Sequence, residues 1–489
     1  MLEIRFDNSY ARELEGMYVP WQGSQAPAPE MLLLNEKLAE EMGLDPVGLA
    51  SDEGLAMLTG TAMPEGASPL AMAYAGHQFG GFSPQLGDGR ALLVGEVIDR
   101  QGFRRDIHLK GSGRTPFARG GDGKAALGPV LREYIMGEGM ASLGIPSTRA
   151  LAAVATGETV WRDEPLPGAV LARVASSHLR VGTFQFFLAR GDTASLRRLA
   201  DYAIRRHDPA LERRDDRYLA FLQAVTERQM ALVAQWMAVG FVHGVMNTDN
   251  SAISGETIDY GPCAFVDGYD KQAVFSSIDA GGRYAYANQP LLAQWNLARL
   301  AEALLPLIAP QNPEDALPDA RAVVDGAAGI YAQERRRRFG TKLGLQAPTE
   351  ADDALIDGFL DILAARRADF TKGFRALAKA AEGDKSALVS HLGNPPGLDD
   401  WLARWHKRLD AQAGDVAAAK ARIAAVNPVY IPRNHLVEAA LADAHKGDLD
   451  TTRRLLDALA QPFRERAGLE AHAAPAPEGF GPYVTYCGT

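Results

Sequence analysis

Apolar runs punctuated by glycine predict a β-containing region in the first third of the chain. From about residue 71 to 172 the sequence is rich in glycine, and within it Ala91–Ile98 and Arg105–Lys110 have the length and composition of strands. Residues 1–70, which come before it, mix loops with short helical runs, and Leu32–Met42 has the period of a helix. We therefore expect an N-terminal extension followed by a sheet.

Helical periodicity dominates the rest of the chain. The segments with an apolar period near 3.6 residues are Leu127–Leu143, Leu219–Val239 and Leu291–Leu307. Gly144 and the proline after Ile145 end the first of these helices. From residue 314 onward the chain is rich in Ala, Leu and Arg and mostly helical, and residues 471–481 are expected to form a surface tail.

The second predicted strand carries polar side chains on one face. Alternation places Asp106, His108 and Lys110 together, opposite Ile107 and Leu109. A lysine on a strand is commonly a solvated edge charge, so its meaning depends on what lies around it.

Composition narrows the class of protein. The 489 residues are 47% hydrophobic and 23% charged, as in ordinary globular chains. The formal net charge of -10 argues against a nucleic-acid binder, and the basic run Arg335–Arg338 is expected to be a solvated helix face. With only two cysteines, no secretory signal pattern and no apolar stretch of about 20 residues, we expect a cytoplasmic protein without a membrane partner.

Three features follow one another in the order found in the N-lobe of kinases. Gly87, Gly89 and Arg90 precede the first strand, where glycine allows backbone N–H groups to approach a phosphate closely, although the same residues also form ordinary turns. Lys110 ends the next strand, and Glu133 lies in the helix that follows. Kinases need such an acidic partner to hold the lysine toward the nucleotide phosphates.

The most specific signal is a loop that follows the helix ending at Val239. His243 and Asn250 keep the spacing of the kinase catalytic loop, and Asp259 begins an Asp-Tyr-Gly sequence. However, Val245 occupies the place of the kinase catalytic aspartate, and the nearest carboxylate is Asp249. Carboxylate and amide oxygens at these positions suit Mg²⁺.

Further basic residues are available for phosphate. The segment from Lys110 to Lys124 is rich in glycine and basic residues, but it is not a P-loop, because no Ser or Thr follows Lys124. Arg173 and Arg180 flank a short polar stretch and would suit bidentate contacts to phosphate oxygens, or they are surface charges.

Read together, these motifs resemble the selenoprotein O family, kinase-fold proteins described as pseudokinases that transfer AMP from ATP to protein hydroxyls. The resemblance runs from about Tyr74 to the C-terminus and is carried by residues 74–91, 108–125, 240–250, 258–265 and 427–435. The family binds ATP flipped relative to kinases, so that the α-phosphate lies at the reacting position.

The resemblance also implies roles for individual residues. Those expected to contact ATP are Gly87, Gly89, Arg90, Lys110, Asp122, Gly123, Arg173, Arg180 and Asp259. Asn250 and Asp259 would hold the metal, Mg²⁺ or Mn²⁺, Asp249 would be the proton acceptor, and Glu133 would pair with Lys110. Some family members carry selenocysteine near the C-terminus, where this chain has Cys487, and a reversible bridge between Cys263 and Cys487 is one hypothesis; two unrelated thiols are the other.

The sequence thus predicts an α+β, protein-kinase-like bilobal fold. Its expected parts are an N-terminal extension (1–70), a β-containing N-lobe (71–172), a helical C-lobe (173–345) and a helical C-terminal extension (346–489). The expected activity is Mg²⁺-dependent transfer of AMP from ATP to Ser, Thr or Tyr hydroxyls of proteins by a monomer. The alternatives are a conventional phosphotransferase that uses Asp249 as a displaced base, transfer of UMP, and a pseudokinase that binds nucleotide without catalysis.

Overall fold

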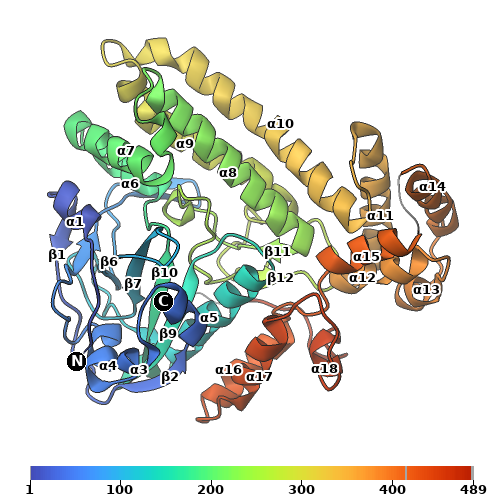
Figure 1. Cartoon of the computed structure of the whole chain (residues 1–489), viewed down its shortest axis with the longest axis horizontal. Coiled ribbons are helices and arrows are strands. Elements are labelled where there is room, and N and C mark those ends of the chain that lie inside the picture. Colours follow the sequence, from blue (N-terminus) through green and yellow to red (C-terminus); the bar gives the residue numbers. More distant parts are fainter. Residues whose placement is uncertain (1, 413–415, 486–489) are drawn as a thin grey trace.

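An antiparallel sheet in the N-terminal part of the chain organises the computed structural model, which describes residues 2–412 and 416–485 (Figure 1). The strands of this sheet, in spatial order, are β1 (Tyr18–Pro20), β3 (Leu70–Met72), β6 (Ala91–Ile98), β7 (Arg104–Lys110), β10 (Pro165–Ala175), β9 (Arg149–Trp161) and β2 (Glu30–Leu34), with β8 (Ala125–Ala126) paired to β10. Residues 1–70 therefore supply both end strands of this order, β1 and β2, so the N-terminal segment is part of the sheet.

The two faces of the sheet are covered by different helices. Short helices α2 (Glu36–Glu41), α3 (Pro46–Leu49) and α4 (Asp52–Thr59) share one apolar cluster with Ile107 and Leu109 of β7. Helix α5 (Leu127–Ser142) packs against β9 and β10 within the main core. Because side chains alternate along a strand, Asp106, His108 and Lys110 of β7 face away from α2–α4.

Long helices form the next layer (Figure 1). They are α6 (Val181–Leu188), α7 (Thr193–His207), α8 (Arg217–Val239), α9 (Gln289–Ile308) and α10 (Leu317–Lys342). Helix α8 ends at Gly240, whose φ of +76° is readily adopted by glycine. The chain then enters β11 (Phe241–Val242), which pairs with β12 (Ala264–Phe265) and so holds the intervening loop at both ends.

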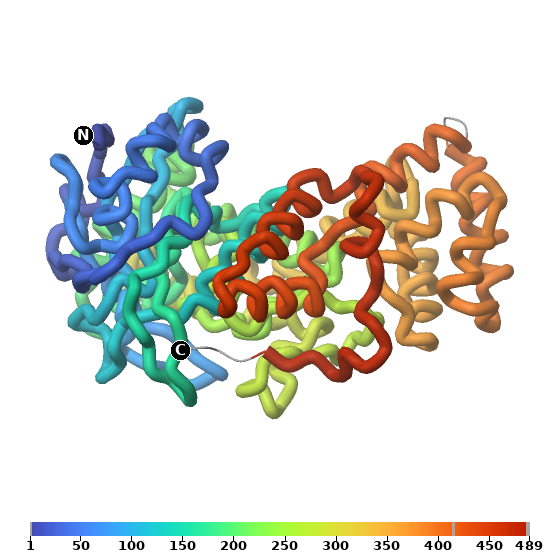
Figure 2. The backbone as a smooth tube through the Cα atoms, turned by 90° about the horizontal axis from the view of Figure 1, so that it is seen from below, coloured from blue at the N-terminus to red at the C-terminus, as the bar shows by residue number. Residues whose placement is uncertain are grey.

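The C-terminal region is helical throughout most of its length. Beyond the end of α10 lie α11 (Asp353–Arg366), α12 (Phe370–Ala380), α13 (Ser386–Leu392), α14 (Leu398–Asp410) and α15 (Val416–Val426) (Figure 1). The chain then returns, and α16 (Asn434–Ala444) and α17 (Asp450–Leu459) pack against α5, between the sheet and the α11–α15 group (Figure 2). Other short elements include α1 (Ser9–Glu13), α18 (Glu470–Ala473), and the hairpin of β4 (Gly76–Gln78) and β5 (Gly81–Ser83).

The predicted combination of sheet and helices is confirmed. The helices expected at 127–143, 219–239 and 291–307 correspond to α5, α8 and α9 within two residues at each end, and the strands expected at 91–98 and 105–110 correspond to β6 and β7. Within the part of the chain that the structure describes, no helix is both long and apolar enough to cross a membrane.

The helix predicted over Leu32–Met42 is wrong at its start. Residues up to Leu34 belong to strand β2, which pairs with β9, and α2 begins only after Asn35, whose side chain accepts a hydrogen bond from the Leu38 backbone N–H. Three consecutive leucines fit either structure, and pairing with a strand distant in sequence decides between them.

The arginines at positions 335–338 of α10 form ion pairs with carboxylates of the same chain. Arg335 pairs with Asp357 at 2.5 Å and Arg336 with Asp353 at 2.8 Å, which joins α10 to α11. Arg337 and Arg338 lie within 2.5 and 3.7 Å of Glu334. The run is therefore part of helix packing, rather than only the solvated face that the sequence suggested.

A buried lysine ends helix α10. Lys342 is 4% exposed, and its Nζ lies 4.4 Å from the ring centroid of Phe374 and 5.5 Å from that of Phe370. Among the described residues no carboxylate forms an ion pair with it. Burial lowers the pKa of Lys342 to about 7.

We predict that Lys342→Met stabilises the protein at neutral pH by a few kcal/mol, because each unit of pKa shift corresponds to about 1.4 kcal/mol. The folded pKa lies below the unfolded one, so between pH 7 and about 10 the unfolded chain binds more protons and wild-type stability rises with pH. Thermal unfolding at pH 7 and pH 9.5 should show the gap between variant and wild type shrinking. Lys37→Met, at an exposed lysine, is the control. A gap that does not depend on pH would contradict the prediction.

Candidate functional site

Four charged side chains, from two strands, one helix and one loop, meet beside the sheet. Lys110, at the end of β7, places Nζ 2.5 Å from Glu133 Oε2 on α5 and 2.6 Å from Asp259 Oδ1 in the loop between β11 and β12. Arg173 of β10 donates from Nη1 to Glu133 Oε1 at 3.1 Å and to Asp259 Oδ1 at 2.8 Å. The contact expected between Lys110 and Glu133 is therefore present. We call these four residues the ion cluster.

Three cations surround the Asp259 carboxylate. Burial alone would raise the pKa of Asp259, but Lys110, Arg173 and Arg180 outweigh it and hold this pKa well below its usual range. The residue also has a φ of +63°, an unusual backbone conformation for a side chain other than glycine, which costs about 1 kcal/mol. The carboxylate is thus charged, and the loop is held in a turn that only a well-packed surrounding maintains.

Arg180 adds a third cation. Its guanidinium lies over the ring of Tyr74 at 4.3 Å, and Nη1 donates to the backbone carbonyl of Asp249 at 3.2 Å. Ion-pair distances of 3.9 Å separate it from both Asp88 and Asp259. The guanidinium is buried, so its orientation is set by these protein contacts.

Asp249 is enclosed by the β4–β5 hairpin. Gln78 Nε2 donates to Asp249 Oδ2 at 3.0 Å, and the His77 backbone N–H donates to Thr248 Oγ1 at 2.7 Å. A Cβ at Gly76 would overlap Asp249 Oδ1, and that oxygen has no hydrogen-bond partner among the described residues. Asp249 is 7% exposed, and burial raises its pKa to about 6, which suits a proton acceptor near neutral pH.

The oxygens available for a cation belong to Asn250 and Asp259. Asn250 Nδ2 donates to the Val245 carbonyl at 3.1 Å, whereas within the described residues neither Asn250 Oδ1 nor Asp259 Oδ2 accepts a hydrogen bond. Nowhere in the described ranges do three or more His, Cys, Asp or Glu residues form a cation cage. A carboxylate and an amide oxygen that leave room for substrate phosphates fit the way proteins hold Mg²⁺.

The glycines before β6 are required by packing. Gly87 has a φ of +119°, and a Cβ there would lie 2.5 Å from the Phe117 ring. A Cβ at Gly89 would lie 2.7 Å from the Phe117 carbonyl oxygen. The Arg90 side chain forms no hydrogen bond or ion pair with any described residue, so its charge is available to a ligand.

Asp122 and Gly123 are not joined to the ion cluster by a direct contact. Asp122 pairs with Arg162 of the β9–β10 connection at 2.8 Å, and its Oδ1 accepts from the Lys124 backbone N–H. Gly123 has a φ of +72° and lies against the backbone of Gly113. The two residues shape the glycine-rich loop, and contact with ATP stays a prediction for them.

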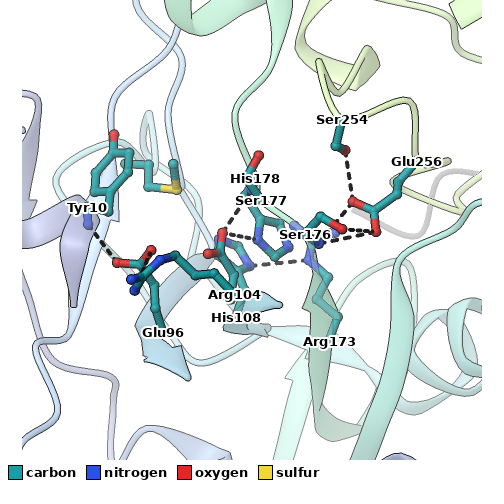
Figure 3. A network of polar contacts seen from close by, with 12 residues as sticks. Tyr10, Glu96, Arg104, His108, Arg173, Ser176, Ser177, His178, Ser254 and Glu256 are labelled. Atoms are coloured by element: carbon teal, nitrogen blue, oxygen red, sulfur yellow. Dashed lines mark hydrogen bonds and ion pairs between the residues drawn. The ribbon is translucent and has the colours of Figure 1, made fainter. Parts of the chain in front are cut away.

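A buried polar network lies behind the ion cluster, and the sequence pattern indicates only part of it. His108 stacks on His178 with ring centroids 4.1 Å apart (Figure 3), and His178 Nδ1 lies 2.9 Å from Asp106 Oδ2. Alternation along the strand indicated that Asp106 and His108 share the face of Lys110. The partners His178 and Arg206, the latter 2.6 Å from Asp106, come from distant segments and left no signal in the sequence.

The network continues to Glu96 of β6 and to Tyr10 of α1. Arg206 Nη1 donates to Glu96 Oε1 at 2.5 Å. Glu96 also accepts from the Tyr10 backbone N–H at 2.6 Å (Figure 3). On the other side, Glu256 accepts hydrogen bonds from Ser176 and Ser254 (Figure 3). These bonds fix the register of β6 and β7 against α7 and so support the site from behind.

Of the two cysteines in the hypothetical redox pair, the structure describes only Cys263. Cys263 is fully buried and has no disulfide partner among the described residues, and burial raises the pKa of its thiol to about 11, so the thiol is protonated at neutral pH. Cys487 lies outside the described residues, and the bridge stays a prediction.

Comparison with known proteins decides the family. The profile described as "Protein adenylyltransferase SelO" matches residues 1–460. The chain belongs to the SelO family. Curated relatives named "Protein nucleotidyltransferase YdiU" are similar along nearly their whole length: one from Cereibacter sphaeroides is 59% identical over 490 residues, with 100% of both chains covered. Those from Pseudarthrobacter chlorophenolicus and Mycolicibacterium smegmatis are 56% and 55% identical, each covering 99% of this chain and 98% of their own.

For this member of the SelO family we predict that Gly76→Ala lowers activity about 100-fold while ATP affinity is retained, because the added methyl group displaces the Asp249 carboxylate but touches no cation of the site. Gly81→Ala, in the same hairpin, meets only an ordinary contact at 3.5 Å and should behave as wild type. Calorimetric titration with ATP and a transfer assay measure the two effects. Equal activity of the two variants would contradict the prediction.

Proposed function

We propose that the protein transfers AMP from ATP to Ser, Thr or Tyr hydroxyls of other proteins and releases pyrophosphate. The observation that carries this proposal is the set of three buried cations, Lys110, Arg173 and Arg180, arranged around Asp259 in a member of an adenylyltransferase family. Catalysis of nucleotidyl transfer depends mainly on positioning and on stabilising charge, and these cations are suited to both tasks.

The cations would serve the phosphates of ATP. A triphosphate brings negative charge that competes with Glu133 and Asp259 for Lys110 and Arg173. Arg90, which has no partner within the described residues, would add a further contact. With the α-phosphate at the reacting position, the same groups would hold the β- and γ-phosphates as the leaving pyrophosphate.

Asp249 would accept the proton of the incoming hydroxyl. The hydroxyl oxygen forms a bond to the α-phosphorus, the bond from that phosphorus to the oxygen bridging to the β-phosphate breaks, and pyrophosphate leaves. Asp249 Oδ2 accepts a hydrogen bond from Gln78 Nε2, and a hydroxyl that replaces this amide would donate to the same oxygen. The raised pKa of Asp249 favours taking up a proton near neutral pH.

The proposal includes a divalent cation, Mg²⁺ or Mn²⁺. Asp259 and Asn250 would hold it, and when bound it would neutralise charge on the phosphates. Lys110 and Arg173 keep Asp259 ionised and oriented for this task.

The same proposal covers the architecture. The order of Lys110 on a strand, Glu133 on the next helix and a catalytic loop after α8 supports a protein-kinase-like bilobal fold with an N-lobe (71–172) and a C-lobe (173–345). The extensions at 1–70 and 346–489, the monomeric state, the lack of a nucleic-acid partner and the cytoplasmic location remain parts of the proposal.

Labelled ATP tests the reaction. Incubation with casein as a hydroxyl-bearing acceptor should leave label on protein from the α-phosphate and none from the γ-phosphate. Intact-mass measurement should show the mass of AMP added to the acceptor. Label from the γ-phosphate alone would identify a phosphotransferase. Greater transfer from labelled UTP than from ATP would identify a UMP transferase. If neither nucleotide labelled the acceptor, the protein would be a pseudokinase that binds nucleotide without catalysis.

We predict that Asp259→Ala and removal of divalent cations each reduce transfer by at least about 100-fold, because the phosphates then lack the divalent cation that would neutralise and position them beside Lys110, Arg173 and Arg180. EDTA should abolish transfer, and excess Mg²⁺ or Mn²⁺ should restore it in the wild type but not in the variant. Asp361→Ala, which removes an exposed carboxylate paired with Lys271, is the matched control. Full activity of Asp259→Ala would show that the assignment of this carboxylate is wrong.

A further inference from the structure

His108 lies beside the ion cluster but has no part in the proposed reaction. It belongs to β7, two residues before Lys110, and its side chain is 0% exposed. Its ring Nδ1 accepts a hydrogen bond from Arg173 Nε at 3.2 Å, and its Nε2 lies 3.0 Å from Asp88 Oδ2 (Figure 3 shows the contact with Arg173). Both ring nitrogens are therefore occupied.

These contacts fix the protonation of the ring. An arginine Nε–H can only donate, so His108 Nδ1 carries no proton, and Nε2–H must be the donor to Asp88. Burial lowers the pKa of His108, so the neutral form is also the one favoured by its surroundings. The ring presents a fixed acceptor on one side and a fixed donor on the other.

The acceptor side determines how Arg173 is turned. With Nε bonded to His108, the planar guanidinium directs Nη1 toward Glu133 and Asp259. The guanidinium is buried, and among the described residues these three are its hydrogen-bond partners. Loss of the bond at Nε would allow rotation of the fork away from the direction in which it meets an anion.

We propose that His108 is a positioning residue, which through Nδ1 holds the Arg173 guanidinium in the orientation that binds the phosphates of ATP. This inference rests on the proposed function only in assigning Arg173 to the phosphates. It assigns to β7 two residues of the nucleotide site, Lys110 by direct contact and His108 through its neighbour.

A purely structural role is the competing explanation, and the two ring nitrogens separate it. His108 also balances the buried Asp88 carboxylate through Nε2 and stacks on His178. Asparagine places an acceptor oxygen near the position of Nδ1 but does not reach Asp88. Glutamine places its amide near the position of Nε2, where it can still donate to Asp88, and leaves Arg173 Nε without its acceptor.

The experiment compares His108→Asn with His108→Gln in the full-length protein with Mg²⁺. We expect the KM for ATP to stay within about twofold of wild type in His108→Asn and to rise about tenfold in His108→Gln, as for loss of one charge-assisted hydrogen bond. Thermal unfolding should show the opposite order, with His108→Asn less stable, because its buried Asp88 has lost a donor.

His178→Gln is the matched control, since it disturbs the stacked pair and the bond to Asp106 but does not touch Arg173. It should lower the unfolding midpoint and leave the KM for ATP unchanged. A KM that follows the unfolding midpoint across the three variants, or that rises equally in His108→Asn and His108→Gln, would overturn the proposal. Because ATP affinity is measured whichever phosphate is transferred, γ-labelling of casein would overturn the proposed function and leave this comparison intact.

Discussion

The ion cluster is the interaction on which the arrangement of the site depends. Lys110 and Arg173 come from two paired strands, Glu133 from the helix that covers them, and Asp259 from a loop held by β11 and β12. Charges in such a buried setting are tolerated only when they are paired, and removal of one partner leaves the others uncompensated. The sheet, α5 and the loop are therefore fixed relative to one another by the same contacts that would receive the substrate.

The cluster also explains why so many polar residues lie behind it. Arg173 is held by His108, His108 is bonded to Asp88, and the stack with His178 leads to Asp106 and Arg206. Each of these residues is bonded to or stacked on the next, and hydrogen bonds between buried polar groups add rigidity, although Asp88 Oδ1 and His178 Nε2 have no hydrogen-bond partner among the described residues. The ion cluster and the polar residues behind it are thus one connected structure.

Local patterns in the sequence predicted the elements, and order along the chain predicted part of the site. Strands β6 and β7 and helices α5, α8 and α9 follow from periodicity, and the spacing of Lys110 and Glu133 indicated their pairing. What local pattern does not contain is contact between distant segments. The strand at Glu30–Leu34 was missed because only its pairing with β9 distinguishes it from a helix.

The same limit applies to single residues of the site. Gln78 meets Asp249 because a hairpin from the N-terminal part packs on the loop after α8, and no periodicity indicates this. Asp122 pairs with Arg162, a residue that nothing in the sequence marked, and contact of Asp122 with ATP stays a prediction.

The enclosure of Asp249, in the proposed reaction, would favour protein acceptors over water. One carboxylate oxygen of Asp249 is bonded to Gln78 and the other lies against the backbone at Gly76, so only 7% of the residue is exposed. A water molecule brings little binding energy with which to displace the hairpin, whereas a protein segment brings a whole contact surface. In the proposed reaction, the closed hairpin would thereby limit hydrolysis of ATP by water until an acceptor protein has docked.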